Sequence, residues 1–422
     1  MDINVERSWI LYDVANSAFV LLAASLLPIY FNDLAAAEGL SDTQYLSYWS
    51  IGTALATLIM LVVGPIIGSY SDRKGWRKPI FVAVVLTGAL SCLALGIPKW
   101  WVAFLLIFVV AKIALNASLV VSDSMLNDIT TPDRMDEISS RCYAAGYIGS
   151  CIPFIACLVV VVMSDFMESG PGYFSFPTAI SISLMITAVW WVVMSLPLFR
   201  NYEQKYYNEA EMETLKEKLT YFLESVKEIS KNKAMALFLI AFFFYIDGVN
   251  TIIEVSVAYG EALNLDSVGL LGALLVTQVV AFPSTLLMSK LSYRIGTHRA
   301  IYICIAGYIA VSVFAIFLST TTQFFIMAII VGFFQGAIQA LSRAYFGRMV
   351  PKEKTGEYFG IMDIFGKGAT IIGTAAIAVF TSIFDNIRMV APILLIMFVI
   401  GFLFFRQSTK VQIYDSEFET DA

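Results

Sequence analysis

Long apolar runs recur along nearly the whole chain, separated by short polar breaks. Runs such as Ile51 to Ile67 and Ile393 to Phe405 have lengths suited to crossing a bilayer, whose hydrocarbon core is roughly 30 Å thick. With the polar breaks as boundaries, the pattern predicts six helices, a charged stretch and six more helices. The predicted helices span residues 8–32, 45–70, 79–97, 100–125, 138–163, 174–198, 234–260, 267–289, 299–318, 322–346, 357–382 and 388–405.

This pattern predicts an all-α integral membrane protein with twelve transmembrane helices in two six-helix, pseudo-symmetric halves. We expect the halves at residues 1–199 and 234–406, a cytoplasmic amphipathic linker at 200–233 and a cytoplasmic tail at 407–422. In the linker, apolar residues recur every three or four positions between charges, which is typical of a helix lying on a surface. They are Met212, Leu215, Leu219, Phe222, Val226 and Ile229. Composition agrees, since 59% of residues are hydrophobic and only 14% are charged.

Lysine and arginine are distributed unequally between the two sides of the predicted membrane. The two termini and the loops on their side hold about 22 of the 27 basic residues, whereas the opposite loops hold only Lys99 and Arg388. By the positive-inside rule both termini are cytoplasmic. We expect a monomer in the bacterial plasma membrane.

The remaining composition excludes several classes of function. The five cysteines lie in or beside apolar segments without metal-site spacing, so we interpret them as packing residues and expect no metal and no cofactor. The sequence also lacks HExxH, GxSxG, P-loop and dinucleotide-binding glycine patterns, which argues against an enzyme or a primary pump. Nucleic acid is not an expected partner.

A polar loop between the second and third predicted helices resembles the loop motif of the major facilitator superfamily, GxxxDRxGRR. The matching residues are Gly68, Asp72, Arg73, Gly75, Arg77 and Lys78. A degraded copy runs from Ser289 to Arg299, at an offset of about 221 residues, or half the chain. We expect Gly68 to allow close helix approach, Asp72 to cap a helix end, and the basic residues to anchor a tight cytoplasmic turn.

A second correspondence links the first and seventh helices, because in each an Asp and an Asn lie three residues apart on one helical face. The two sets are Tyr12, Asp13 and Asn16, and Tyr245, Asp247 and Asn250. The sequence here is similar to a narrower branch, the autophagy-related vacuolar amino-acid effluxer family and its bacterial relatives. The matching stretches are Trp9-x-x-Tyr12-Asp13-x-Ala15-Asn16-Ser17-x-Phe19, Asp247-Gly248-x-Asn250-Thr251 and Gln339-Ala-Leu-Ser342-Arg343-x-Tyr345-Phe346-Gly347, with further matches from Pro351 to Lys367.

That resemblance covers essentially the whole chain and implies a twelve-helix facilitator of small solutes, with amino acids as the cargo in fungal vacuoles. It also implies that helices 1, 4, 7 and 10 line the central cavity. One departure concerns the substrate: Asn116 to Asp123 lacks the Tyr-Asn pair expected in helix 4, so the pocket of the first half differs from the family pattern.

Charges inside predicted membrane helices are costly, at roughly 2.5–3.5 kcal/mol each, and are therefore candidates for function. For any one residue, a structural ion pair between helices stays the alternative. Helical spacing and depth place seven predicted substrate-binding residues near the midplane: Lys112, Asn116, Asp247, Asn250, Gln278, Gln335 and Gln339. The aromatic and amide side chains of Tyr12, Asn16 and Tyr245 complete the predicted substrate site. A cytoplasmic gate of salt bridges is predicted from Asp123, Arg343, Asp363 and Lys367.

Proton coupling is predicted at carboxylates, because the one histidine, His298, lies in a loop. The candidates are Asp247 and Glu254, with Asp13 third. The sequence thus predicts a secondary transporter of a small polar organic solute, by proton symport, with the solute, protons and the lipid bilayer as partners. Lys112 with Asp247 suits an amino acid, whereas the amides and aromatic rings suit a sugar. A substrate sensor on the same fold is the remote alternative.

Overall fold

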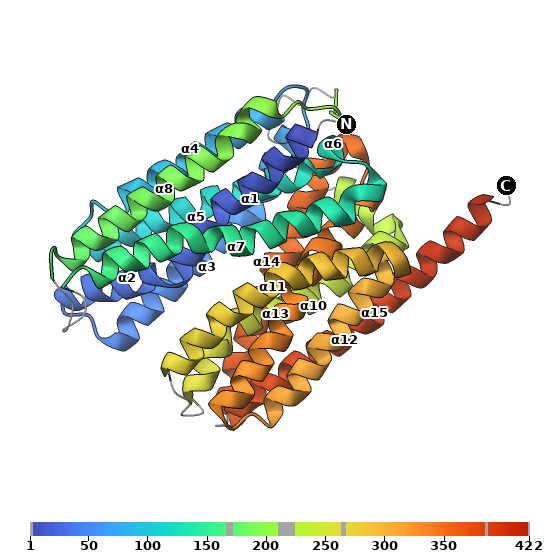
Figure 1. Ribbon diagram of the computed structural model, residues 1–422. Coiled ribbons are helices and arrows are strands. Elements are labelled where there is room, and N and C mark those ends of the chain that lie inside the picture. The colour runs from blue at the N-terminus through green and yellow to red at the C-terminus, as the bar shows by residue number, and fades with distance from the viewer. Residues whose placement is uncertain (1–2, 166–171, 210–223, 263–266, 385–386, 421–422) are drawn as a thin grey trace. The chain divides into compact units, whose positions relative to one another are not determined.

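A computed structural model of the chain describes all residues except 1–2, 166–171, 210–223, 263–266, 385–386 and 421–422. Some further side chains, mostly within 254–274, 369–387 and 413–420, also lie outside the described part. The chain forms two compact units, one of residues 1–130 and 145–209, the other of residues 131–144 and 210–422 (Figure 1). Helix α7 therefore contributes its first turns to unit 2 and the rest to unit 1.

The described secondary structure is helical, as expected where a lipid solvent leaves backbone groups to be satisfied within each segment. The helices from the first half of the chain are α1 (Ile3–Ala24), α2 (Leu26–Ala37), α3 (Asp42–Ser71), α4 (Arg77–Ala94), α5 (Trp101–Ser124), α6 (Leu126–Ile129), η1 (Pro132–Arg134), α7 (Met135–Val162) and α8 (Phe176–Asn201). Those from the second half are α10 (Lys233–Ala262), α11 (Ser267–Ile295), α12 (Thr297–Ile316), α13 (Thr321–Met349), η2 (Lys352–Lys354), α14 (Thr355–Phe384), η3 (Ile387–Met389) and α15 (Val390–Thr420).

Within the described residues, ten segments are long and apolar enough to cross a membrane. Helices α11 and α14, with 29 and 30 residues, are also long, and part of their side chains lie outside the described set. The all-α membrane architecture predicted from the apolar runs is confirmed. Of the predicted linker helix, residues 210–223 lie outside the described part, while 224–231 are helical and Ile229 is buried in the core of unit 2.

The first predicted helix is broken in the structure. Instead of one helix over 8–32, α1 ends at Ala24 and α2 begins at Leu26. Pro28 explains the break, because it has no N–H to donate to the Ala24 carbonyl four residues earlier and its ring crowds that carbonyl. The Ser25 hydroxyl at the junction donates to the Leu21 carbonyl at 2.7 Å.

The internal repeat is visible in the backbone of the two motif copies. Gly75 and Gly296, at the predicted offset of 221 residues, both adopt positive φ, at 75° and 91°. In each copy the glycine lies in the turn between one long helix and the next, which begins at Arg77 in one copy and at Thr297 in the other. The left-handed conformation strains a residue with a side chain, which explains why both copies keep a glycine.

Substituting these turn glycines should therefore destabilise the fold. We expect Gly75→Ala and Gly296→Ala each to lower the free energy of unfolding by about 1–2 kcal/mol, measured by denaturant titration in detergent micelles. Gly75→Asn is the control and should cost less than Gly75→Ala, because Asn tolerates the left-handed region. Equal costs for Ala and Asn would show that backbone conformation is not the reason.

Candidate functional site

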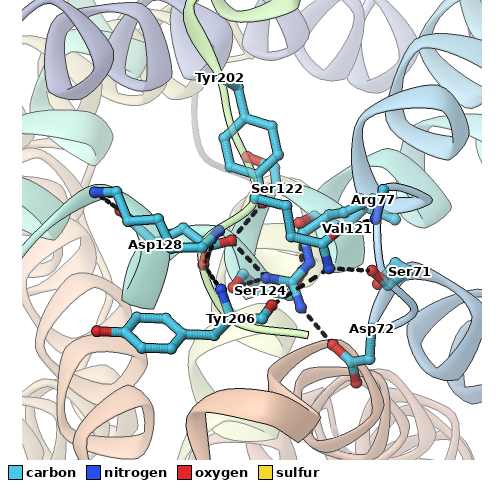
Figure 2. Close-up of polar contacts among 12 residues, drawn as sticks. Ser71, Asp72, Arg77, Val121, Ser122, Ser124, Asp128, Tyr202 and Tyr206 are labelled. Atoms are coloured by element: carbon cyan, nitrogen blue, oxygen red, sulfur yellow. Dashed lines mark hydrogen bonds and ion pairs between the residues drawn. The ribbon is translucent and has the colours of Figure 1, made fainter. Parts of the chain in front are cut away.

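A buried arginine organises the loop motif of unit 1. Arg77 is fully buried, and its Nη1 donates to Asp128 Oδ2 at 2.6 Å while its Nη2 pairs with Asp72 (Figure 2). Asp72 is the last residue before the turn and Asp128 lies on the short helix α6, so the arginine ties two chain segments together. A buried charge is tolerated only when it is paired in this way.

The start of the linker closes this cluster. The Tyr202 hydroxyl donates to Asp128 Oδ2, and the backbone N–H groups of Lys205 and Tyr206 donate to Asp128 Oδ1 at 3.2 and 3.0 Å. Burial raises the pKa of Tyr202 well above its ordinary value, so the hydroxyl keeps its proton and remains a donor. The segment after α8 is thereby held on the loop motif.

The other motif residues lie around this cluster. The guanidinium of Arg73 lies 4.8 Å from the centre of the Tyr70 ring, and the Lys78 ammonium donates to the Arg200 carbonyl at 3.3 Å. Gly68, within α3, offers its carbonyl to the Ser71 hydroxyl at 2.7 Å and to the Asp72 N–H at 3.1 Å. The basic residues surround a tight turn, as predicted. The expected roles of Gly68 in close helix approach and of Asp72 as a cap for a neighbouring helix stay predictions.

In each unit a tyrosine of the first long helix is hydrogen-bonded to a serine of the fourth. The Tyr12 hydroxyl on α1 donates to Ser118 Oγ on α5, and the hydroxyls of Tyr245 on α10 and Ser342 on α13 lie 2.7 Å apart. We call these two contacts the hydroxyl braces. Both tyrosines are buried, so each brace fixes the rotation of its first helix about its own axis.

Beside each brace, an aspartate of the first helix faces a glycine of the fifth. A Cβ added at Gly146 on α7 would overlap the Asp13 carboxylate and come within 2.9 Å of Ser17 Oγ. A Cβ added at Gly373 on α14 would likewise overlap the carboxylate of Asp247, which is 0% exposed. The missing side chain of each glycine is what leaves room for the carboxylate.

The remaining predicted substrate residues lie on long helices of the two units. Asn16, on α1, donates to the Tyr12 carbonyl at 2.9 Å, and Thr251 on α10 donates to Asp247 Oδ1 at 3.3 Å. The buried Gln278 Oε1 on α11 has no hydrogen-bond partner within the described residues. Lys112 and Asn116 lie on α5, Asn250 on α10, and Gln335 and Gln339 on α13. That the two sets line one cavity stays a prediction.

The predicted gate residues have local partners. Arg343 is almost fully buried; its Nε donates to Ser139 Oγ at 2.9 Å, and its guanidinium lies 4.5 Å from the centre of the Tyr143 ring. Asp363 and Lys367 pair with each other along α14. The Asp123–Arg343 pair joins residues of different units and stays a prediction. The side chain of Glu254 lies outside the described residues.

Unit 2 holds the first turn of α7 through a second polar cluster. Asp136 Oδ1 accepts from Arg348 Nη2 at 2.7 Å, and Asp136 Oδ2 accepts from the hydroxyls of Ser292 and Thr297. Ser292 and Thr297 lie on either side of Gly296, so the degraded motif copy holds the start of α7. An aspartate at a helix start also interacts favourably with the helix dipole.

Sequence reasoning missed several of these residues. Asp128, Tyr202, Asp136, Gly146 and Gly373 were not singled out, because they lie at helix ends or within apolar runs. Asp128 carried a detectable signal as a carboxylate at the end of an apolar helix. The two glycines carried none, since a glycine in a membrane helix is common. No three His, Cys, Asp or Glu side chains within the described residues come together as a metal site would require.

Comparison with known families shows to which family this chain belongs. The family described as "Vacuole effluxer Atg22 like" matches residues 4–411. The chain belongs to this family. The resemblance seen in the helix 1, 7 and 10 motifs is therefore confirmed.

Relatives of this Atg22-like chain include bacterial and fungal proteins. It is 38% identical over 399 residues to the uncharacterized MFS-type transporter YxiO of Bacillus subtilis strain 168, covering 94% of this chain and 92% of YxiO. It is 23% identical over 470 residues to autophagy-related protein 22 of Saccharomyces cerevisiae strain S288c, covering 91% of this chain and 88% of that protein.

Solved structures share the fold. FucP, a major facilitator superfamily transporter in its outward conformation, has a TM-score of 0.70 at 15% identity, covering 96% of this chain and 97% of FucP. The proton:xylose symporter XylE has a TM-score of 0.71 at 11% identity, covering 96% and 94%. At these identities the likeness shows the fold alone, and the Atg22-like chain has the major facilitator fold.

The glycine facing Asp247 should be intolerant of substitution. We expect Gly373→Ala to lower the free energy of unfolding by about 1–3 kcal/mol, because its methyl group overlaps the carboxylate. Gly272→Ala on α11 is the matched control; its Cβ would meet Phe325 only at 3.4 Å, so it should change stability by less than about 1 kcal/mol. In an Asp247→Ala background the Gly373→Ala cost should largely disappear; an undiminished cost would rule out the carboxylate as its cause.

Breaking the Arg77 cluster should release the linker. We expect Asp128→Ala to cost about 3–5 kcal/mol, because it removes a partner of a buried cation. Tyr202→Phe should cost only about 1 kcal/mol, the value of one hydrogen bond. Trypsin cleavage after Lys205 measures the release and should be faster in Asp128→Ala than in Tyr202→Phe. Cleavage at the wild-type rate in both variants would contradict the docking of the linker.

Proposed function

We propose that this protein is a secondary active transporter that moves a small polar organic solute by alternating access, coupled to protons by symport. The observation that carries the proposal is the buried aspartate seated against a glycine in each half, Asp13 at Gly146 and Asp247 at Gly373. Membership of the Atg22-like family and the major facilitator fold support the transport function.

Asp13 and Asp247 both lie inside their helices, as we expect of residues that couple proton movement to transport. Counting about 1.5 Å per residue, Asp13 lies about 15 Å along α1 from Ile3, and Asp247 about 21 Å along α10 from Lys233. Both aspartates thus lie within segments long and apolar enough to cross a hydrocarbon core of roughly 30 Å, with Asp13 toward the predicted cytoplasmic end. An ionised carboxylate there is costly, so binding a proton removes a penalty that otherwise resists closure around the site.

The glycines make helix packing sensitive to that proton. Because Gly373 has no side chain, the backbone of α14 lies directly against the Asp247 carboxylate. A change in the charge of this carboxylate therefore acts on the α10–α14 contact. Thr251 can donate to the ionised form at Oδ1 and accept from the neutral acid, so the site serves both states. The protonated, loaded carrier is the form that reorients.

The substrate is an amino acid in our first assignment. Lys112 on α5 and Asp247 on α10 offer opposite charges to the two ends of a zwitterion, and the Atg22-like relatives bear the description of vacuole effluxers. The alternative is a sugar or oligosaccharide, favoured by the amides, of which Gln278 has a buried carbonyl oxygen without a partner within the described residues. A thermal-shift screen of amino acids against sugars separates the two, since ligand at a hundred times its dissociation constant stabilises by about 2.7 kcal/mol.

The remaining assignments follow from the charge distribution. Both termini are cytoplasmic in the proposed topology, in the plasma membrane of a bacterial cell, and the transporter acts as a monomer. Asp123 and Arg343 form the gate when the site opens outward. A substrate sensor on the same fold is the second candidate, and counterflow of labelled solute in proteoliposomes would exclude it.

Removing the Asp247 charge should separate exchange from accumulation. We expect Asp247→Asn to abolish solute accumulation driven by a pH gradient while retaining counterflow, because Asn mimics the protonated acid but carries no proton. The measurement is uptake of labelled amino acids, then sugars, into proteoliposomes. Glu254→Gln and Asp13→Asn are tested in parallel, and Glu224→Gln, an exposed carboxylate in the linker, is the control and should accumulate normally.

Accumulation by Asp247→Asn at the wild-type level would assign the proton to Glu254 or Asp13, whichever substitution abolishes accumulation. If all three variants accumulate solute against its gradient, the driving ion is not a proton bound at these carboxylates.

A further inference from the structure

A row of exposed apolar side chains on α8 ends at Arg200. Met185, Val189, Val193 and Leu196, at spacings of three and four, are between 37% and 55% exposed, and the next member of the row is Arg200, one turn further on. In a membrane protein such a row faces the acyl chains, so Arg200 stands where the hydrocarbon meets the headgroups.

A second cation is fixed beside Arg200. The Lys78 ammonium, at the start of α4, donates to the Arg200 carbonyl at 3.3 Å, and α4 packs against α8. Trp76, exposed by half, lies just before α4, as is common for aromatic residues at a membrane interface. The Lys78 ammonium is thus held at the backbone of Arg200, so one anion at this place can contact both cations.

Unit 2 repeats the arrangement on α12 and α15, which lie side by side (Figure 1). Exposed Ile396, Val399 and Leu403 on α15 lead to exposed Arg406 at the same spacing. The hydroxyls of Tyr302 on α12 and Thr409 on α15 lie 2.6 Å apart and fix the register of the two helices. Exposed Arg299 precedes Tyr302 by one turn on α12, and Arg406 follows Phe405, whose ring centre lies 4.9 Å from that of Tyr302.

The two cation pairs occupy similar places in their halves. Lys78 and Arg299 are separated by 221 residues, the offset of the loop motif and of its turn glycines, and Arg200 and Arg406 each follow the exposed row of the last long helix of their half. We call Lys78–Arg200 and Arg299–Arg406 the rim pairs. Lys78 and Arg299 thus share the repeat offset, whereas Arg200 and Arg406, 206 residues apart, share their place at the end of an exposed apolar row.

Some cations of the predicted cytoplasmic loops form ion pairs with carboxylates, whereas the rim cations form none among the described residues. Arg77, Arg348 and Lys354 each form an ion pair with a carboxylate. Within the described residues, none of the four rim cations does. A cation kept at the membrane rim without a protein anion is available to an anion supplied by the membrane.

We propose that each rim pair binds the phosphate of an anionic phospholipid whose acyl chains lie along the adjoining apolar row. The guanidinium of each pair suits a phosphate, because it offers several N–H donors in a fixed plane. The inference is independent of the transported solute and of the coupling ion.

Titration of delipidated protein with phosphatidylglycerol or phosphatidylcholine, followed by native mass spectrometry, tests this site. The wild type should bind phosphatidylglycerol more tightly than phosphatidylcholine. Each double variant should weaken phosphatidylglycerol binding at its own site about 25-fold, or about fivefold for each cation removed. The double variants are Lys78→Gln/Arg200→Gln and Arg299→Gln/Arg406→Gln. The single variant Arg200→Lys keeps the charge and should retain most of the wild-type affinity. The control Lys227→Gln/Lys231→Gln removes two exposed linker cations and should change neither site more than twofold.

Equal loss of phosphatidylglycerol in the control and in the rim variants would overturn the proposal, because binding would then follow net charge alone. Equal affinity for phosphatidylcholine would overturn it as well. Glycerol phosphate competing as effectively as phosphatidylglycerol would assign the cations to a free anion instead of a lipid. Unchanged unfolding temperatures in detergent without lipid will show that the variants are folded.

Discussion

The direction of the two buried aspartates depends on the hydroxyl braces, which tie the first helix of each half to the fourth. Water does not compete for a hydroxyl inside the bilayer, so the Tyr12–Ser118 and Tyr245–Ser342 hydrogen bonds hold the first helix of each half to the fourth at a fixed rotation. Asp13 and Asp247 follow the two tyrosines by one and two residues. Fixing the tyrosine therefore also fixes the direction of the carboxylate.

The glycines Gly146 and Gly373 complete this geometry by leaving space in the fifth helix for the carboxylate. Each half thus has a hydrogen-bonded contact between helices 1 and 4 beside a carboxylate–glycine contact between helices 1 and 5. In the proposed mechanism, protonation alters the second contact and leaves the first unchanged. This division between a fixed and a responsive helix pair is the physical basis on which we assign coupling to these aspartates.

Basic residues at the predicted membrane surface fall into two groups, according to whether a carboxylate of the protein pairs with them. Arg77 and Arg348 are bound to carboxylates of their own unit and hold helix ends, loops and the start of the linker in place. The rim pairs face outward, where the membrane can supply the anion. The same residue types therefore serve internal structure or the lipid according to whether their helix face is packed or exposed.

The sequence predicted what repeats along one helix or along the chain. Apolar length predicted the helices, the 221-residue offset predicted the paired turns at Gly75 and Gly296, and the spacing of Tyr, Asp and Asn singled out the first helix of each half. The partners across helices were not predictable, because periodicity within one helix does not specify the register against another. Ser118, Gly146 and Gly373 became meaningful only when the helices were placed together. The break at Ser25 was foreseeable from Pro28, whose missing N–H falls on the Ala24 carbonyl.

Proton movement accompanying solute is the most direct test of the account. De-energised vesicles containing the protein, in weakly buffered medium, would receive each solute that stabilises the purified protein, and the external pH would be recorded. The account predicts a transient alkalinisation on solute addition that is abolished by a protonophore and absent from Asp247→Asn vesicles that still perform counterflow. Solute entry without any change in external pH, in vesicles shown to hold a pH gradient, would contradict proton symport.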